Sequence, residues 1–319
     1  MKKGLISLVA VIASVKQKRL VCAILYLMSC FISTSAQIKL SFNPESGTKY
    51  EYQMEMVQNV KQNVMGQTMP METEMNGTYL MEIKDKTPQE IHAQMTYQGF
   101  AFSVSSPMIN ISYDSKNPNE SSSEMDNMFG KMFSALIGKP FTMIFSPNGS
   151  VKSVTGIDAI IESMLGASST SGQVTVQMNA QMGQQFSDEN MKNMFGQSFN
   201  FYPDNAVKVG DSWNLETTMP MNNMNFGIKT KYTLKEVSNN MATIEVEGYT
   251  DMDLAMNMGA EMEGKFTGTQ TGTMIVDTTT GMPVTSDISL NLKGSIKAQG
   301  MDMQMEMNSK TKTSTKGMD

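Results

Sequence analysis

Methionine is the residue type whose number and spacing suggest chemistry in this chain. The sequence contains 35 methionines in 319 residues, and the run from Met301 to Met307 has one at every second position. Alternate residues of a β-strand point to the same face, so this run would place four thioethers side by side. Pairs with the same spacing occur at Met69 and Met71, Met219 and Met221, and Met256 and Met258. Thioethers are soft ligands that suit Cu(I), so a copper site is one hypothesis.

Two other interpretations of the methionines remain open. They alternate along predicted strands and take positions on a predicted helix where leucine is usual, as core side chains do. Methionine is also an unbranched, flexible hydrophobe that suits a pliable ligand-binding surface. The candidate lining residues of such a surface are Met54, Met56, Met128, Phe129, Met132, Phe133, Met303 and Met305.

Other reactive side chains are few. After residue 36 the chain has a single histidine, His92, and no cysteine, which excludes a closed zinc site and a thiol dyad. As a general base His92 would need a carboxylate partner, and the sequence identifies none. Carboxylate pairs at Asp251 and Asp253, or at Asp302 and Glu306, could bind Ca²⁺ or cleave a glycosidic bond, but charged residues on the solvent face of a strand are the ordinary case. We therefore predict no catalytic residue, no metal ligand and no cofactor, and we expect that the protein is not an enzyme.

The first 36 residues are predicted to be a signal peptide. Basic residues at 16–19 precede the apolar run Leu20–Met28, and Thr34–Ala36 supplies small residues for cleavage before Gln37. A lipobox-like Cys30 supports the alternative of a lipid anchor, which would be the chain's attachment to a membrane. A retained anchor is a third alternative, although neither apolar run reaches the roughly 18–20 residues of a spanning helix. We expect a periplasmic or secreted protein, or an outer-membrane lipoprotein.

The charge of the chain excludes nucleic acid as a partner. The formal net charge is −6, and the only arginine, Arg19, lies in the predicted signal peptide. Nucleic-acid affinity depends largely on neutralising phosphates, which an acidic chain without arginine does poorly. Because both cysteines also lie in the signal peptide, stability must come from burial, which is feasible for a domain of this length.

Alternating apolar and polar residues predict strands over most of the remaining chain. The segment Tyr50–Met56 shows this pattern, which is typical of a sheet with one packed and one solvated face. Further strands are predicted over 79–83, 91–97, 100–104, 109–113, 213–219, 226–237, 241–249, 254–262, 266–277, 283–298 and 301–307, and a hairpin with its tip at Pro147–Gly149 is predicted over 141–154. The polar residues 310–317 are expected to form an edge strand or a frayed tail.

Three helices are predicted in the middle of the chain. Apolar residues at helical spacing cover 125–137, between a capping Ser123 and Gly138. A second helix covers 157–165, and Ser187 is expected to cap a third. Because more than ten antiparallel strands in one open sheet curl, the fold class is mainly β (α+β). We expect a large curved antiparallel sheet or half-barrel, with these helices covering its concave face.

Three pairs of segments recur in the same order along the chain. Residues 47–52 correspond to 210–215, residues 78–97 to 231–249, and residues 142–151 to 273–284. These echoes predict a duplicated β unit, although any strand-rich chain can produce similar echoes. The predicted organisation is a signal peptide (1–36) and a single domain (37–319), in which a first β unit (37–155) overlaps a helical, low-complexity insert (about 120–200) and a second β unit follows (201–319).

Several of these motifs resemble those of a known family. The motifs are Ser146–Gly149 with Val154–Gly156, Tyr202–Asp204 with Val207–Trp213, and Asp277–Gly281. Together with the signal peptide, they resemble a family of uncharacterised proteins exported by Gram-negative bacteria, a domain of unknown function. The resemblance covers most of the chain after residue 36 and implies no activity and no site residues. The expected architecture is also loosely similar to the lipoprotein carriers of the periplasm, by analogy alone.

The sequence therefore predicts an exported, non-enzymatic envelope protein. Its curved sheet would bind a lipid or other apolar ligand, or the hydrophobic segment of an envelope protein partner, against a methionine-rich lining. One alternative is a structural or surface-interaction protein that presents a strand edge or a helix face. The other alternative is a Cu(I)-binding protein.

Overall fold

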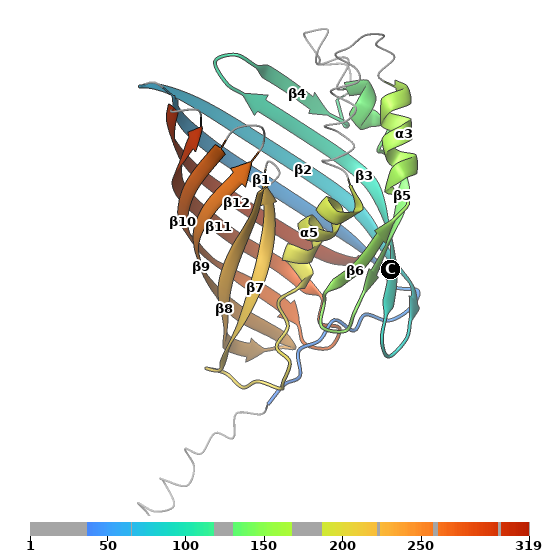
Figure 1. Cartoon of the computed structure of the whole chain (residues 1–319). Coiled ribbons are helices and arrows are strands. Elements are labelled where there is room, and N and C mark those ends of the chain that lie inside the picture. The colour runs from blue at the N-terminus through green and yellow to red at the C-terminus, as the bar shows by residue number, and fades with distance from the viewer. Residues whose placement is uncertain are drawn as a thin grey trace, which may run out of the picture. The chain divides into compact units, whose positions relative to one another are not determined.

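The fold is one large antiparallel sheet with helices on one face (Figure 1). The computed structural model describes residues 37–64, 66–117, 130–167, 187–221, 224–257, 261–298 and 301–318, and Ile38–Asp319 is one compact unit. The elements are β1 (Lys49–Val64), β2 (Gln67–Lys86), β3 (Ile91–Ser105), β4 (Asn110–Asp114), β5 (Pro140–Phe145), β6 (Val151–Thr155), α3 (Ile157–Ala167), α5 (Asp188–Phe199), β7 (Ser212–Met221), β8 (Met224–Ser238), β9 (Met241–Asn257), β10 (Glu261–Asp277), β11 (Pro283–Ala298) and β12 (Met301–Met318). The predicted mainly β fold with a curved antiparallel sheet is confirmed.

The strand order shows two similar runs of neighbours. In space the order is β6-β5-β3-β2-β1-β12-β11-β10-β9-β8-β7, and β4 extends the sheet beside β3. One run passes from β1 to β6 and the other from β7 to β11, and each strand pairs with the next strand of its run, except that β3 pairs with both β4 and β5. The last strand, β12, joins the two runs by pairing with both β11 and β1.

The three sequence echoes lie at equivalent positions in these two runs. Gly47 and Gly210 precede β1 and β7, both have positive φ, and their N–H groups donate at 2.7 Å to the carbonyls of Ile83 and Leu234. A β-bulge follows directly after each of these two acceptors. The turns before β6 and β11 carry the third echo, and each ends with a positive-φ glycine.

The N-terminal segment ties the two equivalent turns together. The N–H of Phe42 donates to the carbonyl of Pro147 at 2.8 Å, and the N–H of Asn43 donates to that of Thr280 at 2.7 Å. A methyl group at Gly281 would lie 1.8 Å from the Ser41 carbonyl oxygen, so only glycine fits where this segment crosses the turn. Backbone contacts of residues 41–43 therefore close the end of the sheet that carries the turns before β6 and β11, which we call the turn end.

Two of the predicted helices are described completely. The helix after Gly156 is α3, and the helix after Ser187 is α5, where the Ser187 hydroxyl accepts a hydrogen bond from the N–H of Asn190. The predicted helix over 125–137 is described only from residue 130, as a helical turn that runs to 134. Buried side chains of α3 and α5 pack on the inner face of the sheet, as predicted. No helix among the described residues has the length and apolar character needed to cross a bilayer.

Three strand predictions are wrong. Residues 91–97 and 100–104 are not two strands, because both segments lie in β3. Residues 254–262 are not a separate strand, because Leu254 continues β9 in register with β10. Residues 310–317 are neither an edge nor a frayed tail, because they form the end of β12 in the centre of the sheet. Hydroxyl side chains replace the expected apolar ones on the inner face of this strand, and the Thr313 and Ser286 hydroxyls lie 2.8 Å apart.

The inner face of the sheet has two halves of different composition. We call the part that packs against α3 and α5 the aromatic half, because its largest buried side chains are Phe42, Tyr52, Tyr79, Tyr97, Phe141, Phe145, Phe195, Phe199 and Phe201. We call the part toward the β1–β2 and β11–β12 hairpin tips the methionine half. Its buried floor consists of Val60, Ile228, Phe266, Leu290, Leu292 and Met307, with Met252, Ile296 and Met305 packed beside it.

Candidate functional site

The aromatic half is a filled core. Tyr52, Tyr79 and Tyr97 lie side by side on β1, β2 and β3, with ring centroids 5.9 Å and 4.8 Å apart. Phe195 and Phe199 of α5 pack over these rings at 5.5–6.3 Å. Aromatic pairs at such distances stabilise a core beyond the area they bury, so this half has the packing of a structural element.

Burial keeps the tyrosine hydroxyls of this half neutral. Burial raises the pKa of Tyr52 to about 12, and its hydrogen bond with Ser198, at 2.9 Å, opposes part of that rise. Burial also raises the pKa values of Tyr79 and Tyr97 above the usual 10, and these two hydroxyls share a hydrogen bond. A buried phenol with a raised pKa is a poor base and a poor nucleophile at neutral pH.

The methionine half is the candidate binding surface. The register places Met75 opposite Met56, Met71 opposite Val60, and Met69 opposite Gln62. On its other side β1 pairs with β12, which places Met307 opposite Val60 and Met305 opposite Gln62. The residues that this pairing gathers on one face, which we call the methionine lining, are Met56, Met69, Met71, Met75, Met303, Met305 and Met307.

Part of the methionine lining is open to solvent. Met69 and Met71 are 37% and 39% exposed, whereas Met307 is buried in the floor below them. Met56, Met75, Met303 and Met305 are half-buried. The exposed thioethers lie nearest the hairpin tip, so the surface passes from a buried floor to an accessible edge.

The predicted lining residues are distributed over several places. Met56, Met303 and Met305 belong to the methionine lining, and Met54 is buried in the aromatic half. Met132 and Phe133 are buried, and the Phe133 ring packs 4.9 Å from that of Phe100 and 5.9 Å from that of Tyr113. Met128 and Phe129 lie outside the described residues. The predicted lining residues therefore do not form one site. Those on β1 and β12 share the methionine lining, except Met54, which like Met132 and Phe133 is part of the core.

Sequence reasoning missed the contribution of β2. Met69, Met71 and Met75 complete the lining, and the spacing of the first two was visible in the sequence. Which strand lies beside β1, and in which register, follows from pairing across the hairpin at Gly66. A register shift of one residue would turn all three side chains to the other face.

In the methionine half, charge is confined to the outer face of these strands. Alternation places the charged residues that β1, β2 and β12 contribute there, for example Glu55, Glu72 and Glu306, on the outer face. No described inner-face position of the methionine half carries a charged side chain. Three of its polar side chains donate hydrogen bonds within the protein: Thr230 to Gln270 at 3.1 Å, Thr250 to the Gly227 carbonyl at 2.6 Å, and Gln58 to the Met307 sulfur at 2.6 Å.

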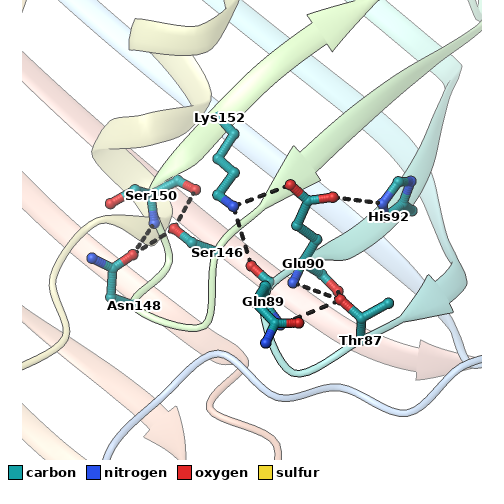
Figure 2. A network of polar contacts seen from close by, with 8 residues as sticks. All are labelled: Thr87, Gln89, Glu90, His92, Ser146, Asn148, Ser150 and Lys152. Carbon is teal, nitrogen blue, oxygen red and sulfur yellow. Dashed lines mark hydrogen bonds and ion pairs between the residues drawn. The ribbon is translucent and has the colours of Figure 1, made fainter.

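His92 has a carboxylate partner that sequence reasoning did not find. Its Nε2 lies 3.4 Å from Oε2 of Glu90, two residues earlier, and Lys152 Nζ lies 3.1 Å from the other oxygen (Figure 2). The hydrogen bond from Lys152, and then that from His92, lowers the pKa of the Glu90 carboxyl. Lys152 also donates to the Gln89 carbonyl at 3.3 Å, so the network fastens the turn at 87–90 to β6. His92 lies between the buried Ile91 and Ala93 and so takes the solvent face of β3, where its partner gives it a structural role.

Three of the other candidate carboxylates point outward, and the side chain of the fourth, Asp253, lies outside the description. Asp251 lies on the outer face of β9, and Asp302 and Glu306 lie four residues apart on that of β12. Glu306 pairs with Lys293 at 3.1 Å. Among the described residues no group of three or more His, Cys, Asp or Glu side chains is arranged to hold a metal ion.

The outer face also carries a shallow depression of about 440 Å³. It crosses β1, β12, β11 and β10, and its lining is polar, with Ile275 as the one apolar residue. Glu55, Lys312 and Asp287 lie in one row across it. Opposite charges in register on a solvated face are typical of sheet stabilisation.

Comparisons with known proteins agree with a chain of unassigned function. The model of DUF6263, a family of unknown function, matches residues 89–283. A search of curated proteins gives no match.

Solved structures show only weak likeness to this chain. The chain is similar to a structure described as "Lipid-protein interactions in lipovitellin" at 9% identity and a TM-score of 0.46, over 85% of this chain and 25% of that one. It is also similar to OccK7 (OpdD) of Pseudomonas aeruginosa at 6% identity and a TM-score of 0.21, over 86% of this chain and 100% of that one. The β domain of the Bordetella autotransporter BrkA gives 5% identity and a TM-score of 0.21, over 82% and 98%. The chain thus spans a quarter of the lipovitellin chain that it matches.

Proposed function

The chain belongs to the DUF6263 family, whose function is unknown, and we propose that it is a non-enzymatic, exported envelope protein that binds an apolar ligand on the methionine half of its sheet. Export and an envelope location follow the signal-peptide pattern of residues 1–36. The resemblance to exported proteins of Gram-negative bacteria supports the same location.

One observation carries the proposal. A single sheet face combines a buried apolar floor with half-buried and exposed methionines and has no charged side chain at its described positions. Exposed apolar surface that continues into a buried cluster marks a binding surface on a soluble protein. Methionine adapts its shape to what it contacts, which suits a surface that is covered only when a ligand is present.

A matched pair of variants on β2 tests the proposal. Met71 points to the inner face and its neighbour Glu72 to the outer face. The purified protein is titrated with the apolar fluorophore N-phenyl-1-naphthylamine. We expect binding to the natural protein and to Glu72→Lys, and at least tenfold weaker binding to Met71→Lys, because a buried ammonium without a partner opposes an apolar ligand. Equal binding by all three proteins, or by none, would refute the proposal.

Cu(I) binding is the second candidate, and it is favoured by the adjacent exposed thioethers of Met69 and Met71. They lie two positions apart on one strand face, and flexible side chains at that spacing can bring two sulfurs to one soft ion. The test is titration with Cu(I) under reducing conditions, comparing the natural protein with the double variant Met69→Leu, Met71→Leu. Affinity no higher than that of free methionine would exclude it.

A further inference from the structure

The methionine half also constrains what kind of apolar ligand it can hold, if the proposed function is correct. A buried charge on the ligand would have no partner there, because the ionisable residues of the surrounding strands face outward. Burying an unpaired carboxylate or ammonium is prohibitively unfavourable. Any charged group of the ligand must therefore stay outside the lining, in water.

An extended peptide is a poor match for this surface. Strands β1, β12, β11 and β10 are paired on both sides, so an added strand finds no free edge in the centre of this surface, and β2 is unpaired on its β3 side only at its tip, over 67–71. The inner-face hydroxyl and amide groups of Thr230, Thr250 and Gln58 already bond within the protein. The peptide groups of a bound segment would lose water without gaining partners.

The length of the lining matches a membrane-lipid chain. The methionine lining extends along β1 from Met56 to Gln62, and along the paired stretch of β2 from Met75 to Met69. The six residue-to-residue steps of such a strand segment span about 20 Å. One leaflet of a bilayer has a hydrocarbon thickness of about 15 Å, half of the roughly 30 Å core. A complete acyl chain therefore fits along the lining.

The side chains of the lining favour a flexible ligand. Thioether side chains have three rotatable bonds and no fixed shape, so they form no rigid slot for a planar ring system. The floor beneath them is uneven, because the ring of Phe266 lies over Gly294, where an added methyl group would come within 2.2 Å of it. An unbranched chain can follow such a surface, whereas a rigid ring would bridge its hollows.

We infer that the ligand is an unbranched acyl chain that lies along the methionine lining, with its head group left in water near the exposed Met69 and Met71. Affinity then depends on chain length and not on the charge of the head. Each methylene removed from water strengthens binding by up to about fourfold, until the chain exceeds the lining.

Competition with bound N-phenyl-1-naphthylamine tests this inference on the full chain. The competitors are octanoate, decanoate and dodecanoate, the neutral amide of dodecanoate, and cholesterol. We expect displacement to strengthen two- to fourfold per methylene, dodecanoate and its amide to differ by less than threefold, and cholesterol to compete at least tenfold more weakly. The Met71→Lys variant, compared with Glu72→Lys, should lose the chain-length dependence.

The outcomes separate this inference from the proposed function. If the fluorophore does not bind at all, the proposed function fails and the inference fails with it. If the fluorophore binds but cholesterol displaces it best, or chain length has no effect, the ligand is not an acyl chain while the apolar site stands. A more than tenfold preference for the carboxylate over the amide would show a cation at the site and would overturn the placement of the head group.

Discussion

The two halves of the inner face are built on the same strands but differ in how they are filled. In the aromatic half, rings from β1, β2, β3, α5 and the N-terminal segment interlock, and Tyr52, Phe42 and Phe199 are fully buried. In the methionine half, a buried floor continues into thioethers that are more than one-third exposed at Met69 and Met71. Rigid rings fix one packed arrangement, whereas flexible thioethers leave room for several. The comparison teaches that the tightly packed core and the proposed binding surface occupy different ends of one sheet.

The largest expected effect is the loss of an aromatic ring from the core. Phe199 packs 5.4 Å from Phe42, 5.9 Å from Tyr52 and 5.1 Å from Phe145. Phe199→Ala should lower the free energy of unfolding by about 3–5 kcal/mol, because it leaves a cavity among rigid neighbours. The measurement is urea unfolding followed by circular dichroism.

Met71→Ala is the matched change in the methionine half. Its side chain is already 39% exposed, so the expected loss is below about 1 kcal/mol. If both variants lost equal stability, the two halves would not differ in packing and the comparison would be wrong.

Alkaline pH should destabilise the fold through the buried tyrosines of the aromatic half. The folded-state pKa of Tyr52 and that of Tyr232 are each raised to about 12 by burial, above the unfolded value of 10. The unfolded chain therefore loses these protons first as pH rises. The stabilising contribution is complete below pH 10 and is lost between pH 10 and about 12, on the order of 2–3 kcal/mol for Tyr52 alone.

Unfolding midpoints in urea between pH 8 and 11.5 check this expectation. Tyr52→Phe should be less stable at neutral pH, because it loses the hydrogen bond to Ser198, and should show a shallower fall above pH 10. If the stability of this variant fell equally steeply above pH 10, Tyr52 would not be a source of the alkaline loss of stability.

A smaller loss of stability is expected when a glycine at either end of the sheet is replaced by alanine, and the two losses should differ. Gly281 at the closed turn end and Gly66 at the β1–β2 hairpin tip both have positive φ. A Cβ at Gly281 would clash with the Ser41 carbonyl, whereas at Gly66 nothing lies within 4 Å. Both alanine variants carry backbone strain of about 1–2 kcal/mol, and Gly281→Ala should cost about 1–2 kcal/mol more. Equal costs would mean that the N-terminal segment does not hold the turn in solution.

The sequence predicts the pattern within each strand better than the pairing between strands. Alternation indicates the face of Met56 and Met305, and the glycine signals locate the turns that need positive φ. Pairing across β1 is not encoded in any one segment, so the contribution of Met69 and Met71 was missed. The second half of β12 was mistaken for an edge, because Thr313 and Thr315 are polar although buried in the centre of the sheet. Glu90 was missed as the partner of His92, although side chains two residues apart lie on the same face of an extended segment.

The smallest expected effects lie on the outer face, where the two halves should be alike. Lys235 and Glu245 pair at 3.1 Å on strands that pack over the aromatic half, and Lys293 and Glu306 pair at 3.1 Å over the methionine half. All four side chains are well exposed, so each pair should stabilise the fold by about 0–1 kcal/mol, and less at high salt. Double-mutant cycles with alanine, at 0.05 M and 0.5 M NaCl, measure both interaction energies. Values that agree within about 0.5 kcal/mol would locate the difference between the halves on the inner face. A pair energy above about 2 kcal/mol over one half would mean that the outer face, too, distinguishes them.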